Sequence, residues 1–388
     1  MTSQALDADV LVVGAGPVGL FLAGDLRAHG ARVTVLERLT RPTTESRAST
    51  LHARTMEIFA ERGLLERFGE LPGGGPGHFG GMPLDLTTAD PLHPHAGQWK
   101  CPQTRIEAVL QEWATDLGAQ VLRGHTVDGL LQEEHAVRVS ARTVEGTVRT
   151  FTASHLVGCD GEESTVRRLA GFELGGRAAT IEMLRADVAG LDIPNRRFER
   201  HPDGVATAYR WPDGTTRVMV HLYGRTPEPR SGPPSFDEIV AAWAKTTGED
   251  VSGGTPLWLN AFDNASLQTT RYRMGRVLLA GDAAHVQMPV GGLALNLGLQ
   301  DAAALGPKLA APATGTEGRD PLDDYDERHA VGARTLTNIA AQARLLLGGP
   351  DVDGLRTVFG ELLGIDAVRR HLARTIAGLP VRQSHTPS

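Results

Sequence analysis

The sequence has little of what disulfide, nucleic-acid or membrane chemistry requires. Its two cysteines, Cys101 and Cys159, lie far apart and form no CxxC pair, so a disulfide reductase is not expected. It has no dense run of lysine and arginine, and its formal net charge of -7 argues against a nucleic-acid surface. No apolar stretch approaches the roughly 18 residues of a membrane span, and the N-terminus lacks a signal-peptide pattern. We therefore expect a soluble cytoplasmic protein with no nucleic-acid or membrane partner.

The N-terminal region has the pattern of a βαβ unit. An apolar run at 10–13 leads into Gly14-x-Gly16-x-x-Gly19, a helical pattern follows, and a second apolar run ends on Glu37. In such a unit the first glycine permits the tight turn, the second the approach of a pyrophosphate, and the third close packing of helix on strand. Glu37 lies 18 residues beyond Gly19, near the spacing of a ribose-binding acid. The pattern predicts a dinucleotide site; the alternative is an ordinary strand–turn–helix.

The chain of 388 residues is long enough for two or three domains with filled cores. A helix capped by Thr104 is predicted for 104–117, where apolar residues recur at helical spacing. Three strand-like runs after it predict a small antiparallel meander: 120–123, 136–139 and 147–151.

Residues 176–268 are dominated by strand patterns. Alternating apolar and polar residues predict a largely antiparallel sheet, covered by one helix at 235–246. A buried strand at 276–280 follows and ends in Gly281-Asp282. Further helices are predicted at 293–309, 322–347 and 353–376.

Three motifs stand in a fixed order: the glycines at 14–19 with Glu37, then Gly158-Cys159-Asp160-Gly161, then Gly281-Asp282 with Pro289-x-Gly291-Gly292. In this arrangement the sequence resembles the FAD-dependent aromatic hydroxylases, single-component flavin monooxygenases of the p-hydroxybenzoate hydroxylase type. Within them it looks most like the hydroxylases of bacterial angucycline and anthracycline polyketide pathways. The stretches that support this subgroup are 45–47, 53–57, 77–81, 156–161 and 327–332.

The resemblance implies an α/β fold. It consists of a Rossmann-like, glutathione-reductase-type FAD-binding domain with an inserted, mostly antiparallel β-sheet domain for the substrate, followed by C-terminal helices. A thioredoxin-like third domain is not expected. The implied divisions are 1–75, 100–175 and 269–345 for the FAD-binding domain, 76–99 and 176–268 for the substrate domain, and 346–388 for a C-terminal helical segment and tail.

The resemblance also implies the residues that contact the cofactor. The glycine loop would hold the FAD pyrophosphate, and Glu37 the adenosine ribose. Asp160 would serve both FAD and NAD(P)H, while Pro289 and Arg47 would take part in catalysis at the flavin ring. The expected cofactor contacts are Gly14, Gly16, Val18, Gly19, Glu37, Arg38, Arg47, Gln103, Val127, Asp160, Asp282, Pro289, Gly292, Leu295 and Asn296.

The implied reaction is hydroxylation of a polycyclic aromatic polyketide in antibiotic biosynthesis. NADPH or NADH would reduce FAD, and a flavin C4a-hydroperoxide formed with O2 would transfer its distal oxygen to the ring. No metal is expected. The sequence singles out no general base. The candidate substrate contacts are His78, Tyr209, His221 and Asn260, residue types that are more often structural than catalytic in such positions.

The sequence departs from the family pattern at the predicted flavin loop. Leu293 and Ala294 stand where the family usually has glutamine and glycine, and Ala294 would disfavour a positive φ. Pro307, where a tryptophan is common, would kink or end the helix, and Ala304 replaces a common asparagine. These departures keep a non-oxidative alternative open, as a cyclase, a dehydratase or a partner subunit of an oxygenase. Baeyer–Villiger oxidation or epoxidation, and a homodimer, also stay open.

Overall fold

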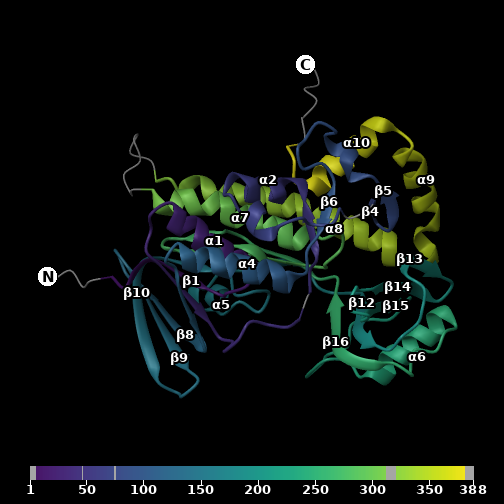
Figure 1. Ribbon diagram of the computed structural model, residues 1–388, viewed down its shortest axis with the longest axis horizontal. Coiled ribbons are helices and arrows are strands. Elements are labelled where there is room, and N and C mark those ends of the chain that lie inside the picture. The colour runs from purple at the N-terminus through teal and green to yellow at the C-terminus, as the bar shows by residue number, and fades with distance from the viewer. Residues whose placement is uncertain (1–5, 46, 74–75, 312–319, 381–388) are drawn as a thin grey trace.

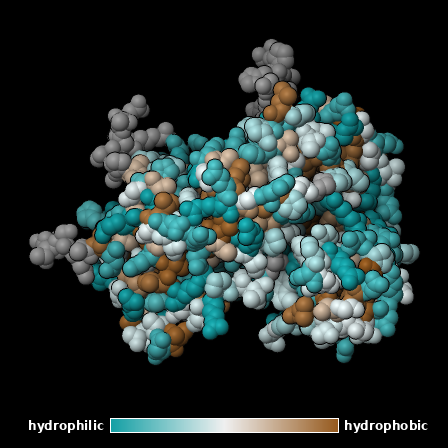
Figure 2. Space-filling model, viewed as in Figure 1, coloured by the Kyte–Doolittle hydropathy of each residue, from teal (hydrophilic) through white to brown (hydrophobic). Residues whose placement is uncertain are grey.

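The computed structural model describes residues 6–45, 47–73, 76–311 and 320–380, and the predicted C-terminal tail lies almost wholly outside them. Figure 1 shows a larger lobe around the N-terminal strands, a smaller lobe formed by a second sheet with its helix, and the C-terminal helices above that sheet. Hydrophilic and hydrophobic residues are interspersed over the same face in Figure 2. Within the described ranges, no helix has the length and apolar character needed to cross a membrane.

The predicted βαβ unit is present. It consists of β1 (Ala8–Val13), α1 (Pro17–Ala28) and β2 (Val33–Glu37). β1 pairs in parallel with β2 on one side and with the end of β10 (Val148–Gly158) on the other. Its valines and leucine are buried by helices and neighbouring strands, as is typical of a parallel sheet. Beyond β10 the sheet continues through β19 (Val277–Leu279) to β18 (Arg273–Met274), and beyond β2 it ends at β7 (Gln120–Arg123).

Two predictions for the segment after residue 102 were wrong. β7 pairs in parallel with β2 and is not part of the meander, because α4 (Gln103–Asp116) provides the crossover that a parallel strand needs. A short apolar run looks alike whichever neighbour it pairs with. Thr104 is not the cap of α4 either, because the helix begins directly after Pro102. The meander consists of β8 (His125–Gln132), β9 (Val137–Thr143) and the first part of β10.

The predicted antiparallel sheet and its covering helix are both present. The strands run in the order β13-β14-β15-β12-β16, and α6 (Phe236–Thr247) packs Ile239 and Trp243 against Leu184 and Val188 on one face. Since side chains alternate along a strand, the other face carries a second set, including Arg185, which points toward the larger lobe. The strands are β12 (Glu182–Ala189), β13 (Arg196–His201), β14 (Gly204–Arg210), β15 (Thr216–Leu222) and β16 (Thr255–Asp263).

The C-terminal helices differ from the prediction in their ends. α7 (Leu293–Ala310) continues past Pro307 for three residues. The predicted helix 322–347 is a 3-10 turn, η3 (Asp323–Glu327), followed by α8 (Arg328–Leu347). The predicted helix 353–376 is two helices, α9 (Asp353–Leu363) and α10 (Asp366–Ala377), because the Arg369 guanidinium bonds the carbonyl oxygens of residues 363 and 364 and caps α9 there.

Shorter elements connect these parts. β3 pairs with β6, β4 pairs with β5, and β11, β17 and β20 form a small sheet. Their bounds, with those of the remaining helices, are β3 (Thr50–His52), α2 (Ala53–Glu61), α3 (Leu65–Phe68), β4 (Gly77–Phe79), β5 (Met82–Leu84), η1 (Leu86–Ala89), β6 (Gln98–Lys100), α5 (Thr165–Ala170), β11 (Leu174–Arg177), β17 (Ser266–Thr269), η2 (Gly281–Ala283), β20 (His285–Gln287) and η4 (Pro350–Val352).

Two helical glycines test the packing of α1 on α4. A Cβ at Gly24 would lie 2.2 Å from the Trp113 ring, whereas one at Gly360 in α9 would meet nothing within 4 Å. Both alanine substitutions gain helix propensity, worth about 1 kcal/mol. We expect Gly360→Ala to raise the free energy of unfolding by about that amount, and Gly24→Ala to lower it by about 1–3 kcal/mol through overpacking. Urea unfolding measures both; equal effects would contradict the described packing.

Candidate active site

Three loops meet at one edge of the large sheet. β1, β10 and β19 lie side by side in parallel, with Val13 opposite Gly158 and Gly158 opposite Leu279, so the motifs that follow them emerge together. A Cβ at Gly14 (φ +103°) would lie 2.4 Å from the Cys159 carbonyl oxygen. Only glycine therefore allows this approach. The sheet brings together segments that are more than a hundred residues apart in the sequence.

The N-terminus of α1 is open to an anion. Gly16 takes the N-cap position without a capping side chain, and the first turn contains no acidic residue. A Cβ at Gly16 would meet no atom within 4 Å, whereas one at Gly19 would lie 2.0 Å from the Gly14 carbonyl oxygen. The free N–H groups and the helix dipole thus face space into which a pyrophosphate fits. Val18 contacts the third motif, since a Cβ at Gly281 would lie 3.1 Å from its methyl group.

Glu37 links the end of β2 to the glycine loop. Its carboxylate accepts hydrogen bonds from the Ala15 N–H at 2.7 Å and from the Leu39 N–H at 2.8 Å. The half-buried carboxylate remains beside the open N-terminus of α1, where a ribose hydroxyl would need an acceptor. Arg38 is exposed beside it, and Val127 is buried on β8 next to a β-bulge.

A second open helix N-terminus lies at the start of α7. Gly292 (φ +73°) precedes the helix without a capping side chain, and Leu295 lies in the first turn. Pro289 and Asp282 are exposed nearby. The surrounding protein raises the pKa of the Asp282 carboxyl by desolvation. These positions fit the ring end of a dinucleotide whose pyrophosphate lies at α1.

The departures at Leu293 and Ala294 cause no backbone strain. Ala294 is in regular helix, and the described residues contain a single non-glycine with positive φ, at Phe198, so the conflict expected from the sequence does not arise. Leu293 is buried and packs in one cluster with Met288 and Val290. The positive φ angles in this loop belong to glycines at 291 and 292.

Asn296 fastens the start of α7 to β3. Its amide nitrogen donates to the carbonyl oxygens of Thr50 at 2.9 Å and Gly292 at 2.7 Å, and its amide oxygen accepts from the His52 N–H at 2.9 Å. The side chain is thus fully engaged within the protein.

A buried charge network supports the Gly281 loop, and sequence reasoning missed it. Asp301 accepts from His285 Nε2 at 2.7 Å and from Arg328 Nε at 2.9 Å, and lies 3.4 Å from the Gly281 nitrogen. Burial alone would raise the pKa of the Asp301 carboxyl, but Arg328 and His285 lower it. The available signal was Arg328, which stands in one of the family stretches.

The side chains of Asp160 and Gln103 accept hydrogen bonds from backbone N–H groups. Asp160 accepts from the Ser164 hydroxyl at 2.5 Å and the Val166 N–H at 3.1 Å, so its carboxylate caps α5, and burial raises its pKa. The Gln103 side-chain oxygen accepts from the Ala48 N–H at 3.2 Å and thereby holds the segment beside Arg47. Their contacts with FAD stay predictions.

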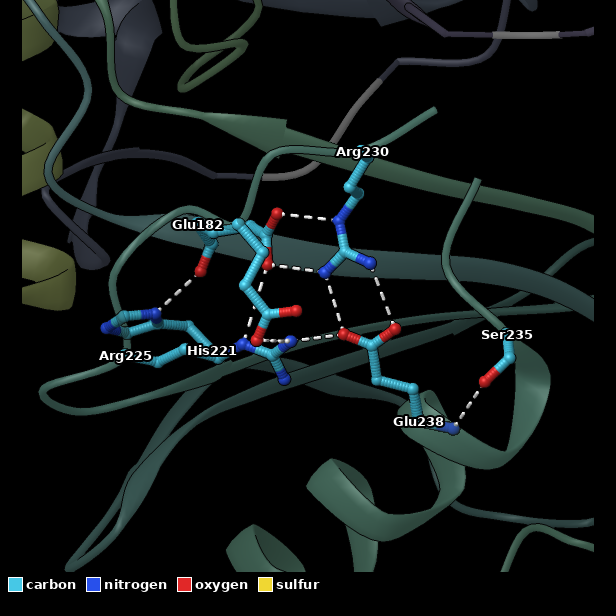
Figure 3. A network of polar contacts seen from close by, with 7 residues as sticks. Glu182, His221, Arg225, Arg230, Ser235 and Glu238 are labelled. Carbon is cyan, nitrogen blue, oxygen red and sulfur yellow. Dashed lines mark hydrogen bonds and ion pairs between the residues drawn. The ribbon is translucent and has the colours of Figure 1, made fainter. Parts of the chain in front are cut away.

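A cavity of 590 Å³ lies between the segment at Arg47 and β16. Its wall includes Arg47, Asn260 and Arg230. Figure 3 shows Arg230 between the carboxylates of Glu182 and Glu238, which it bonds at 2.7–3.0 Å. This network fixes the loop before α6 against the sheet, so Arg230 keeps its place at the cavity.

The four candidate substrate residues have different environments. His221 donates from Nδ1 to the Glu182 carbonyl oxygen at 2.8 Å, and Asn260 accepts from Arg185 at 2.8 Å. His78 accepts from the Gly81 N–H at 3.2 Å, and burial lowers its pKa to about 3, so it is a poor base near neutral pH. Tyr209 is 47% exposed and stacks edge-on against Trp211.

The sheet order, the glycine loop and the open helix N-termini define a dinucleotide-binding fold. The chain matches the FAD binding domain family over residues 7–339 and belongs to that family. Rifampicin monooxygenase of Streptomyces venezuelae is 40% identical over 391 residues, covering 96% of this chain and 79% of that protein. The anhydrotetracycline monooxygenase of Streptomyces rimosus is 39% identical, covering 96% and 77%. The resemblance inferred from the sequence is therefore confirmed.

Solved structures of similar fold agree with this family assignment. BexE, of BE-7585A biosynthesis, has a TM-score of 0.91 at 47% identity, covering 96% of this chain and 76% of that one. CabE, an aromatic hydroxylase from angucycline biosynthesis, has a TM-score of 0.90 at 45% identity, covering 97% and 77%. The chain is an enzyme of the FAD-dependent monooxygenase class, with FAD as cofactor. One relative is named for another reaction: a dialkyldecalin synthase of Streptomyces rugosporus is 35% identical, covering 95% and 80%.

Two buried histidines predict how stability depends on pH. Burial lowers the pKa of His52 to about 4 and that of His78 to about 3, so both are neutral in the folded protein and take up protons on unfolding below about pH 6.5. Stability is therefore present at neutral pH and lost as the pH falls from about 6.5 toward 4. Each histidine should remove about 2 kcal/mol between about pH 7 and pH 5.

Urea unfolding of the wild type, His52→Gln and His78→Gln at the two pH values measures this loss. Each variant should lose about 2 kcal/mol less than the wild type over the interval. His371→Gln, at an exposed position of α10, is the control. A wild type that is equally stable at both pH values would refute the neutral buried histidines.

Proposed function

We propose that this enzyme hydroxylates a polycyclic aromatic polyketide in antibiotic biosynthesis, with FAD, O2 and NADPH or NADH. The observation that carries the proposal is that the uncapped N-termini of α1 and α7 lie close together, since a Cβ at Gly298 in α7 would lie 2.7 Å from the Val18 side chain in α1. FAD bound there supplies the oxygen-activating chemistry after reduction by the nicotinamide. Relatives named for rifampicin, anhydrotetracycline and angucycline chemistry support this substrate class.

The residues of the chain would bind FAD and orient it. The N–H groups of α1 would hold the pyrophosphate and Glu37 the ribose, while the first turn of α7 would favour negative charge on the flavin ring. Apolar side chains of the inner sheet face and of the loop before α7 belong to one cluster, which would exclude water from the ring. They include Met183, Met219, Phe262, Met288 and Val290.

The proposal includes the division into domains inferred from the sequence. The large parallel sheet would bind FAD, and the antiparallel sheet would bind the substrate. Support comes from the strand order, since β12 to β16 form a sheet of their own between β11 and β17 of the chain. The contacts of Arg38, Val127 and the other predicted residues with FAD are part of this proposal.

A non-oxidative cyclisation is the second candidate, favoured by the dialkyldecalin synthase among the relatives. The sequence departures at Leu293 and Ala294 also pointed to it. Because the start of α7 is unstrained, these two residues no longer argue for cyclisation. The two candidates differ in one requirement. Hydroxylation consumes O2 and NAD(P)H with each turnover, whereas cyclisation consumes neither.

Gly16 offers a direct test of the cofactor site. Because a Cβ there would meet no protein atom within 4 Å and the backbone is extended (φ −78°), Gly16→Val should fold normally and block only the pyrophosphate. We expect at least about a hundredfold weaker FAD binding by fluorescence titration, with an unchanged melting temperature. Gly253→Val, at another open glycine, is the matched control and should keep its FAD.

Turnover decides between the two candidates. With the FAD-loaded protein, anhydrotetracycline and rifampicin serve as probes for stimulated NADPH oxidation and for incorporation of labelled oxygen from O2 into a product. Stimulation with one labelled oxygen atom per product supports hydroxylation. Products formed without O2 and NADPH would instead support cyclisation, and failure to bind FAD would refute the proposal.

A further inference from the structure

Arg185 lies between two aromatic rings, on the face of the second sheet that is turned away from α6. Its guanidinium carbon is 4.5 Å from the centroid of the Trp258 ring and 5.0 Å from that of Phe262. Arg185 belongs to β12, and both rings belong to the neighbouring strand β16. Only 4% of Arg185 is exposed, which is unusual for a charged residue.

No acid neutralises Arg185 directly. Among the described residues it makes no ion pair, whereas Arg217 beside it bonds both carboxylate oxygens of Asp187 at 2.7 Å. Burial, with the nearby charge of Arg217, lowers the pKa of Arg185 to about 9, so the group stays charged at neutral pH. Burying an unpaired charge is costly, and the bonds that its donors make must offset that cost.

The guanidinium bonds two residues of one cavity. One terminal nitrogen donates to the Asn260 side-chain oxygen at 2.8 Å, and the other donates to the Arg47 carbonyl oxygen at 3.4 Å. Asn260, Arg47 and the stacked Trp258 all line the cavity of 590 Å³ between β16 and the Arg47 segment. A single buried side chain therefore contacts three residues of the cavity wall.

Arg185 fixes which way the Asn260 amide faces. A guanidinium only donates hydrogen bonds, so the amide oxygen must be the atom that faces it. The amide nitrogen then points away from Arg185, and it has no partner among the residues that the structure describes. Since Asn260 lines the cavity, this nitrogen is available to a bound molecule. The charge behind the amide also polarises it and strengthens the N–H as a donor.

Flat apolar groups form much of the remaining wall. Trp258 contributes an indole ring, and Pro233 and Pro256 contribute two rigid rings. Aromatic ligands pack well against such surfaces. The volume of the cavity is also within the usual range for a small-molecule site, in which a few placed polar groups set the orientation of the ligand.

The charged side chains of the cavity are already paired. Arg230 bonds Glu182 and Glu238, as Figure 3 shows, and the Arg47 guanidinium bonds Glu45 at 3.2 Å. An anionic ligand would have to compete with these carboxylates, whereas a neutral acceptor needs only the free amide N–H. A carbonyl oxygen attached to a flat ring is such an acceptor.

We infer that Arg185 is a positioning residue, which turns the Asn260 amide toward the cavity to bind a carbonyl oxygen on a flat ring that lies against Trp258. The inference rests on the proposed function and specifies the chemistry that this site recognises. Two participants in the proposed reaction carry such a group: the nicotinamide, in its carboxamide, and the aromatic polyketide, in a ketone.

Two matched pairs of ligands test the recognition and identify its source. NADP⁺ is compared with its thionicotinamide analogue, in which sulfur, a weaker acceptor, replaces the carboxamide oxygen. 6-Acetyl-2-naphthol is compared with 6-ethyl-2-naphthol, which lacks the carbonyl. Calorimetric titration of the FAD-loaded protein measures each dissociation constant. In at least one pair we expect the carbonyl ligand to bind about tenfold more tightly. The pair that shows this discrimination identifies the nicotinamide or the substrate as the occupant.

Variants assign the discrimination to Asn260 and its dependence to Arg185. Asn260→Leu keeps the side-chain volume but removes the donor, so the discrimination should disappear. Arg185→Lys keeps the charge, but an ammonium lacks the planar fork that spans Asn260 and Arg47, so the discrimination should fall at least about threefold. In the Asn260→Leu background, Arg185→Lys should cause no further fall, as expected for a residue that acts through Asn260.

Arg196→Lys is the matched control. Arg196 is on β13, at the opposite edge of the sheet, with its guanidinium carbon 6.0 Å from the centroid of the Trp243 ring. It is also largely buried, but it does not line the cavity, so its variant should discriminate as the wild type does. Because Asn260 is only half-buried, on an edge strand, Asn260→Leu stays informative if Arg185→Lys fails to fold.

Four results would overturn the inference. They are equal binding within both pairs, unchanged discrimination in Asn260→Leu, unchanged discrimination in Arg185→Lys, and equal weakening of both members of a pair in Arg185→Lys, which a merely structural role would cause. The two proposals fail separately. A protein that selects the carbonyl but never consumes O2 contradicts the hydroxylation alone, and one that hydroxylates without this selection contradicts the role of Arg185 alone.

Discussion

The candidate active site depends on how closely three backbone loops approach one another. Side chains at Gly14 and Gly19 would lie 2.4 Å and 2.0 Å from carbonyl oxygens, so these loops can close only on glycine. Their closure requires β10 beside β1, which puts the ends of three parallel strands in register. What remains open is Gly16 and the exposed Asp282, where a dinucleotide can approach. The site is thus the space left after the loops have packed.

The loop at Gly281, after β19, needs side-chain hydrogen bonds that its own glycine cannot provide. Asp301 supplies it by joining His285 and Arg328 and by approaching the Gly281 N–H. A buried charge that loses its partner costs several kcal/mol, so such a network tolerates no missing member. Since the three side chains come from β20, α7 and α8, these two helices support the Gly281 loop directly.

The sequence predicted what is encoded locally. The βαβ unit, the second sheet and the motifs at strand ends follow from apolar periodicity and glycine spacing. The neighbour of β7 and the break at residues 364 and 365 were missed, because pairing partners and helix ends depend on distant contacts. The bulge at Phe198 had no local signal for the same reason, because it is visible only where β13 pairs with β14. The cofactor contacts themselves stay predictions.

A fold shared with monooxygenases and with a dialkyldecalin synthase does not by itself determine which reaction occurs. The decision lies with the groups that face the ring. A cycloaddition between neutral partners develops little charge and gains little from charged groups beside the ring. An electrophilic oxygen donor, in contrast, reacts faster with a ring that carries an anionic oxygen.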